Sequence, residues 1–285
     1  LVSGDFDTTQ ITALDVLLPW SAGIVWASEA TAAELLQQLY GTAGGNYYED
    51  SSGDILLDYL FPPLAFGPYG NPCLDFRGKG GNQISFGDLG DASGSFTLIC
   101  WFRVHATDTS VVTLTQTPPV GHCLITKGGA TPLGNYCLTL PLRDATTAGK
   151  LYLGVAGPTT STLESATGLY EPGTWYCLVA ALDNTAKTMR LYIAPKGGTL
   201  VEVASNSGWT GSPTTNNGAL VVGGHNDINI LDYPWCAISH AQVWTTTFNL
   251  AQLQALMDTP PVGGEANLVF YAKLTEGSGT TVTET

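Results

Sequence analysis

The sequence has few charged residues, no long apolar run and no zinc-type cysteine motif. Charged side chains make up 12% of its 285 residues, about half of the roughly 25% that is usual for globular domains. The 10 Lys and Arg residues are scattered, against 24 Asp and Glu, for a net charge of -14. A nucleic acid would be repelled, so we expect no such partner. No run of about 18 apolar residues occurs, and we therefore expect no membrane span.

The six cysteines show no C-x-x-C spacing, which disfavours zinc-binding and thioredoxin-type sites. Cys100, Cys137 and Cys177 each lie within an apolar, strand-like run. Cysteine in such a run behaves as a small hydrophobe, so these three are predicted to be buried free thiols. A disulfide between Cys73 and Cys123, or between Cys123 and Cys236, stays open from the sequence alone.

What is abundant is glycine, with 34 residues, together with threonine and short apolar runs. Between residues 71 and 274 these runs are separated by Gly, Pro, Asn and Thr clusters about every ten residues. This spacing favours an antiparallel sandwich over βαβ units. We expect strands over 84–86, 96–104, 111–115, 122–126, 136–140, 150–155, 174–182, 189–193, 200–204, 219–222, 238–244 and 268–274.

The run 96–104 is apolar on both faces when its residues alternate. Phe96, Leu98, Cys100 and Phe102 form one face, and Trp101 belongs to the other. A strand that is apolar on both faces is predicted to lie in the middle of its sheet. The residues that we expect to be buried in or behind the sheets are Leu98, Trp101, Trp175, Val179, Leu191 and Val243.

Two short amphipathic helices are predicted from capping-box patterns. Thr31 and Glu34 open a helix over 32–40, and Asn249 and Gln252 open another over 250–257. Each is short, and its apolar side is expected to pack on a sheet. Both follow a strand-like run and precede a Gly-Gly pair with another strand-like run. This similarity is either a weak internal repeat or chance.

Several segments resemble, in the same order, the laminin G-like and pentraxin-like jelly-roll family. They are Cys73–Gly78, Gly94–Arg103, Leu124–Gly129 with Asn135–Leu140, Gly173–Asp183 with Met189–Ile193, and Ile238–Trp244. The chain departs from the family pattern at Ser239, where an acid is usual, and at Ala194, which follows the Leu-Tyr-Ile step.

The resemblance implies an all-β fold, a two-sheet antiparallel concanavalin A-like jelly-roll sandwich with two short peripheral helices. The sandwich is expected over residues 71–275, with an N-terminal extension over 1–70 and a C-terminal tail over 276–285. Residues 11–61 look like the closing strand–helix–strand of a partial sandwich. Because a partial sandwich leaves strand edges unpaired, we expect it to pair with a neighbouring chain, as a homo-oligomer or larger assembly, or to fold back.

Catalytic patterns are missing, and the chain is therefore not expected to be an enzyme. Glycosidases on this fold need two carboxylates that face one cleft, and no strand carries such a pair. No G-x-S-x-G elbow occurs, and the four histidines are scattered. His240 alternates with polar neighbours and is expected to be a surface or structural residue.

Calcium is the best inorganic candidate, because relatives often bind it at the sandwich rim through Asp and Asn oxygens. The predicted metal ligands are Asp227, Asn229 and Asp232, which lie in the loop richest in such oxygens. Asp88 and Asp91 form a second acidic cluster. Ordinary turn chemistry would explain both clusters equally well.

Aromatic residues gather in the same part of the sequence. Trp209, Tyr233 and Trp235 lie in Gly- and Pro-flanked text, and Asn226 adds an amide. Aromatic faces beside amides are what sugar recognition uses, so these four are the predicted ligand-binding residues. The alternative is that the aromatic rings anchor loops to the sheet.

Together these features predict a non-enzymatic surface module that binds glycan or another surface ligand through rim loops. The alternative is a structural or decoration protein of a virion or extracellular fibre, built by homo-oligomeric contacts. The expected location is extracellular, on a cell surface or on a virion surface.

Overall fold

The computed structural model describes residues 46–49, 55–58, 67–70, 73–77, 83–104, 121–128, 135–141, 149–157, 161–224 and 235–274. The chain divides into two compact units, Leu1–Ala65 and Phe66–Thr285. In the smaller unit, strands β1 (Asn46–Glu49) and β2 (Ile55–Asp58) pair antiparallel. The predicted helix over 32–40 and the predicted strand over 111–115 lie outside the described residues.

The larger unit contains a seven-stranded and a six-stranded antiparallel sheet. The seven-stranded sheet has the order β12-β11-β10-β5-β14-β15, and β3 also pairs with β14. Its strands are β3 (Leu74–Arg77), β5 (Phe96–Val104), β10 (Tyr176–Asp183), β11 (Thr188–Pro195), β12 (Val201–Asn206), β14 (Trp235–Trp244) and β15 (Leu268–Ala272).

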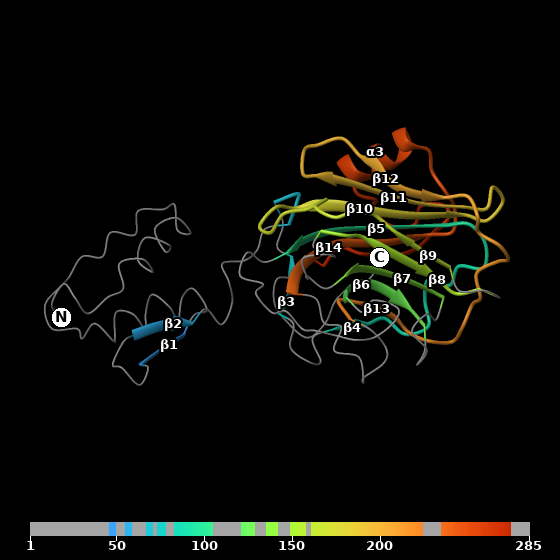
Figure 1. Cartoon of the computed structure of the whole chain (residues 1–285). Helices are drawn as coiled ribbons and strands as arrows, with labels where there is room; N and C mark the ends of the chain where they lie inside the picture. The colour runs from blue at the N-terminus through green and yellow to red at the C-terminus, as the bar shows by residue number, and fades with distance from the viewer. Residues whose placement is uncertain are drawn as a thin grey trace, which may run out of the picture. The chain divides into compact units, whose positions relative to one another are not determined.

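The six-stranded sheet has the order β4-β13-β6-β7-β8-β9. Its strands are β4 (Ile84–Ser85), β6 (Gly121–Lys127), β7 (Tyr136–Pro141), β8 (Tyr152–Val155), β9 (Ser161–Glu164) and β13 (Leu220–Val222). The two sheets lie face to face as layers (Figure 1). The predicted concanavalin A-like jelly-roll sandwich is therefore confirmed.

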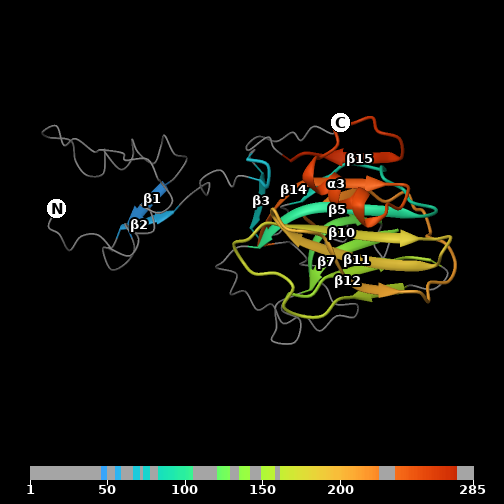
Figure 2. The same cartoon turned by 90° about the horizontal axis from the view of Figure 1, so that it is seen from above.

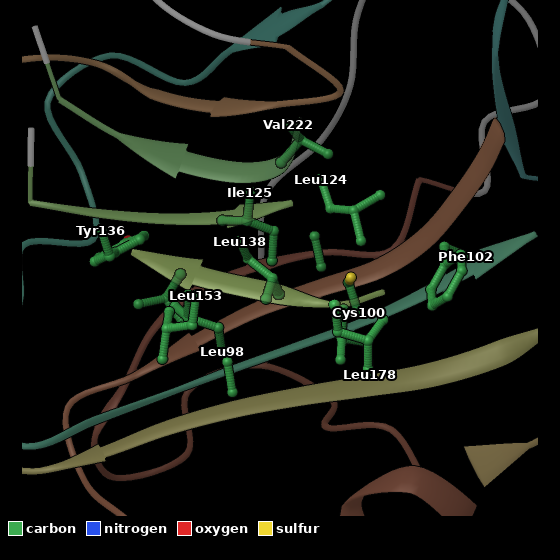
Figure 3. Close-up of a cluster of buried hydrophobic side chains, with 14 of the residues drawn as sticks. Leu98, Cys100, Phe102, Leu124, Ile125, Tyr136, Leu138, Leu153, Leu178 and Val222 are labelled. Carbon is green, nitrogen blue, oxygen red and sulfur yellow. The ribbon is translucent and has the colours of Figure 1, made fainter. Parts of the chain in front are cut away.

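The core lies between the layers and is built from alternate residues of facing strands. On β5, Leu98, Cys100 and Phe102 point inward and are fully buried. Figure 3 shows them opposite Leu138 and Leu153 of the six-stranded sheet. The other face of β5 is buried as well, since Ile99 and Trp101 are 0% and 2% exposed, and β5 pairs with β10 on one side and β14 on the other. Its predicted central position is confirmed.

The prediction of which residues are buried is also confirmed. The six predicted core residues are all buried, from 0% exposure for Leu98 to 7% for Trp175, over which the Arg103 guanidinium lies at 5.3 Å. Cys100, Cys137 and Cys177 are buried free thiols, as predicted. Strand β9 was not predicted, because Ser-Thr-Leu-Glu at a sheet edge has no apolar run to mark it.

One helix is described, α3 (Leu250–Asp258), and it begins with the predicted capping box. The Asn249 side chain accepts from the Gln252 backbone, and the Gln252 side chain accepts from the Asn249 backbone at 2.9 Å. Leu253 and Met257 are buried beneath it. Figure 2 shows α3 over the seven-stranded sheet. Among the described residues, no helix has the length and apolar character to cross a membrane.

Candidate functional site

The outer face of the seven-stranded sheet is closed. Ile99 and Val179 point away from the core but have no exposed surface. Helix α3 lies on this side of the sheet, and Tyr69 adds a second cover by contacting Trp101 edge-on at 5.8 Å between ring centres. A ligand would have to displace these covers to bind on this face.

One end of the sandwich is closed too, namely the end where β5 begins and β10 finishes (the closed end). Lys127 is fully buried there. Its ammonium donates to Asp88 Oδ1 at 2.5 Å and to the Gly218 carbonyl at 2.5 Å, and Asp91 Oδ1 lies 3.4 Å away. The two carboxylates are thus already paired with the Lys127 ammonium. The acidic cluster of Asp88 and Asp91 therefore does not fit a calcium site.

Trp209 lies at the same closed end. Its indole is 2% exposed, and Nε1 donates to Asn184 Oδ1 at 3.1 Å, just beyond the end of β10. Because its ring faces are covered, the prediction that Trp209 binds a ligand is wrong. Its buried, hydrogen-bonded position agrees with the alternative interpretation, in which the ring anchors a loop.

Trp209 and Trp235 are also too far apart to share a site. Trp235 pairs with Arg77 at the start of β14, next to the pair formed by Cys236 and Val104. Asn184, the partner of Trp209, donates its backbone N–H to Ser95 at the other end of β5. The eight steps from Phe96 to Val104 span about 26 Å at roughly 3.3 Å per residue.

The remaining predicted site residues are Asn226, Asp227, Asn229, Asp232 and Tyr233, and these lie outside the described residues, as does the side chain of Trp235. Their roles in ligand and calcium binding stay predictions. In the part of the chain that is described, no group of three or more His, Cys, Asp or Glu side chains is placed to hold a metal ion.

The outer face of the six-stranded sheet has a different character, which sequence reasoning missed. Register pairs Cys123 with Thr139, Thr139 with Tyr152, and Tyr152 with Glu164, so these residues form one row across β6, β7, β8 and β9. A parallel row, which pairs residue by residue, contains Val221, Thr126, Cys137, Gly154 and Thr162. We call these two rows the polar face.

Two hydroxyl groups at the centre of the polar face are buried and unsatisfied. Thr139 and Tyr152 are each 2% exposed. Among the described residues, neither Thr139 Oγ1 nor the Tyr152 hydroxyl has a hydrogen-bond partner of normal geometry. An unpaired buried hydroxyl costs about 1–3 kcal/mol. Since they are neighbours in the register, both could bond to one polar group that replaced the atoms now covering them.

The surroundings of Tyr152 favour its neutral form. Burial raises the pKa of the Tyr152 hydroxyl far above its ordinary value, and the nearby charge of Glu164 adds to the rise. The Thr162 side chain counters the rise in part, although no hydrogen bond of normal geometry joins it to the hydroxyl. Tyr152 is thus available as a neutral donor and acceptor at any physiological pH.

The polar face extends toward the end opposite the closed end. Tyr136 contacts Phe96 at the closed end, and Thr139 follows three residues later on β7, so the row of Thr139 and Tyr152 is displaced from that end. At the end of the sandwich opposite the closed end, two half-buried tyrosines, Tyr170 and Tyr176, cover Phe102 of β5, with ring centres 5.3 and 5.9 Å from it.

Comparisons with known proteins identify the family of this chain. The model of the concanavalin A-like lectin/glucanase superfamily matches residues 78–254. No curated protein matches the sequence. A heptameric SAP-like pentraxin from Limulus polyphemus is 15% identical, with a TM-score of 0.46 over 74% of this chain and 92% of the pentraxin chain.

A carbohydrate-binding module of a Ruminococcus gnavus sialidase, solved with α2,3-sialyllactose, is similar in the same way. It is 17% identical, with a TM-score of 0.40 over 63% of this chain and 96% of the module. The family match covers more than half of the sequence, and the chain belongs to the concanavalin A-like lectin/glucanase superfamily.

Proposed function

We propose that this protein is a non-catalytic glycan-binding module and that the polar face is its binding surface. The observation that supports the proposal is the adjacent pair of buried, unpaired hydroxyls on Thr139 and Tyr152. A saccharide presents neighbouring hydroxyl groups that both donate and accept, which is the complement of this pair. Both faces of the sandwich are covered in this structure, because α3 and Tyr69 lie on the opposite face while Thr139 and Tyr152 are each 2% exposed. A ligand would therefore reach this pair by displacing the atoms that cover it.

The polar face has the wrong composition for glycoside hydrolysis. Both known mechanisms use two carboxyl groups, separated by about 5–5.5 Å or about 6.5–9.5 Å. Glu164 is the one acid among the residues of the two rows, and it forms an ion pair with Lys150 at 3.4 Å. Its partners across the row, Tyr152 and Thr139, are neutral. This composition supports binding without bond cleavage.

The ligand is expected to be a neutral saccharide. The chain carries a net charge of -14, and such a field disfavours the approach of sialylated or sulfated glycans. On an array at low salt, neutral oligosaccharides should give the strongest signals. Signals from anionic analogues should rise relative to them as salt screens the field. Tightest binding of anionic glycans at low salt would contradict this expectation.

Removing either hydroxyl should weaken binding without weakening the fold. Tyr152→Phe and Thr139→Val each delete one hydroxyl and keep the shape of the side chain. We expect about 2- to 10-fold weaker affinity for each, since a hydrogen bond contributes about 0.5–1.5 kcal/mol. The melting temperature should stay the same or rise, because an unpaired buried polar group is removed. Titration calorimetry and thermal melts measure the two effects.

Tyr192→Phe is the matched control, because Tyr192 is 5% exposed but belongs to the seven-stranded sheet. Its affinity should equal that of the parent. Unchanged affinity in both polar-face variants would remove the polar face from the proposal. The predicted homo-oligomeric contacts and the predicted extracellular, cell-surface or virion-surface location stay predictions.

A further inference from the structure

His240 lies in an unusual backbone position. It belongs to a bulge of β14, where the pairing with β5 shifts between Ser239 and Gln242. Its φ is 52°, in the left-handed region that few non-glycine residues adopt. Bulges of this kind redirect a side chain relative to the sheet. Here the redirected imidazole is 3% exposed.

The imidazole holds together residues from separate segments. Nδ1 lies 2.7 Å from the Tyr271 hydroxyl of β15, and the Tyr69 ring stands edge-on to the imidazole with 4.7 Å between centres. The Tyr69 hydroxyl accepts from Trp101 Nε1 at 3.0 Å and donates to the Met257 carbonyl of α3. The segment 67–70 is thus tied to β5 and α3 through Tyr69, with His240 packed directly under its ring.

Among the described residues, no acid is paired with this imidazole. Lys273, directly after β15, acts on it with a positive charge. Tyr271, Tyr69 and Cys177 of β10 are neutral at physiological pH, and burial raises the pKa of each. Asp258 of α3 acts on Tyr69 and Cys177, not on His240. Burial first, and Lys273 second, lower the pKa of His240 from 6.5 to about 4.

We propose that His240 is an acid-sensitive latch: while neutral it holds the segment 67–70 on the outer face of the seven-stranded sheet, and its protonation releases Tyr69. This device is independent of the glycan site, because it acts on the opposite sheet.

Tyr69 is the element that moves. Tyr271 and Trp101 are held within paired strands, whereas Tyr69 is half-buried and belongs to a four-residue described segment outside both sheets. Displacing its ring lets water reach the charged imidazole without breaking a strand pairing. The docked imidazole has a pKa of about 4 and a fully solvated one has 6.5, so acidification raises the ratio of released to docked segment by at most about 300-fold. The rise is smaller than this limit because Tyr271 and Lys273 stay beside the imidazole after release.

Hydrogen exchange on the full chain tests the latch. The Gly70 N–H donates to the Gly67 carbonyl at 3.1 Å, so a peptide covering 67–70 reports on the segment. After correction for intrinsic rates, its protection should fall steeply between pH 7 and pH 4. Peptides from β10 and β11 should keep their protection over the same range, which separates release from global unfolding.

His240→Asn is the matched variant, because asparagine tolerates a left-handed backbone and does not titrate. Protection of the segment in this variant should not change with pH. Tyr69→Phe, which deletes both hydrogen bonds of Tyr69 but keeps His240, should exchange faster at pH 7 and still respond to acid. The latch is refuted if the parent shows no loss at pH 4, or if His240→Asn loses protection as the parent does.

Discussion

Replacing Asp88 and Asp91 together by asparagine is expected to lower the free energy of unfolding by about 3–5 kcal/mol. The Lys127 ammonium is fully buried, and these two carboxylates are its counter-charges, at 2.5 and 3.4 Å. Asparagine keeps an oxygen that can accept from Lys127 but carries no charge, so the ammonium is left with neutral acceptors such as the Gly218 carbonyl, at 2.5 Å. A buried charge without a counter-charge is among the most destabilising changes known for a folded protein.

Urea denaturation of the parent and of the double variant measures this loss. Glu202→Gln is the control, because Glu202 pairs with Arg190 at 3.7 Å where both side chains are more than 40% exposed. That exposed pair should contribute about 0–1 kcal/mol. Equal stability of the double variant and the control variant would show that Lys127 reaches water in solution.

Trp209→Ala is expected to lower the free energy of unfolding by about 3–5 kcal/mol, the usual loss for a deleted core aromatic. The indole is 2% exposed and hydrogen-bonds to Asn184. It also packs so closely on Gly157 that a Cβ built there would lie 3.0 Å from its ring. The variant therefore leaves a cavity, and Asn184 Oδ1 keeps Lys187 Nζ, at 2.9 Å, as its one remaining donor among the described residues.

Trp209→Phe separates the two contributions, because it keeps most of the apolar volume and loses only the indole N–H. Its loss of stability should be clearly smaller than that of Trp209→Ala in the same denaturation experiment. A Trp209→Ala variant as stable as the parent would instead show that the ring is exposed in solution. The prediction that Trp209 binds a sugar would then be reinstated.

The architecture could be predicted from the sequence because alternation and turn spacing are local signals. The run 96–104 marked β5 to the residue, and the Asn249 capping box marked α3. Trp209 was misplaced because its Gly- and Pro-flanked context looks the same whether the ring anchors a loop or faces solvent. Only the position of Asn184 decides between the two.

The polar face could not be predicted, because it depends on register. Thr139 and Tyr152 are 13 positions apart and meet only when β7 and β8 pair in one particular alignment. A shift of either strand by one residue would turn that strand's side chain into the core. Similarly, the bulge that turns His240 under Tyr69 has no local marker, since histidine is enriched at positive φ but most histidines still have a negative φ.

The pairing of β14 sets where this domain can be cut. Its first half pairs with β3, over Leu74–Arg77, and its second half with β15, over Leu268–Ala272. Both partners lie outside residues 78–254, the part that matches the superfamily. A fragment trimmed to that match would expose one whole side of β14 as an unpaired, mostly apolar edge. Such an edge invites aggregation, so a soluble domain should run from Phe66 or earlier to beyond Leu274.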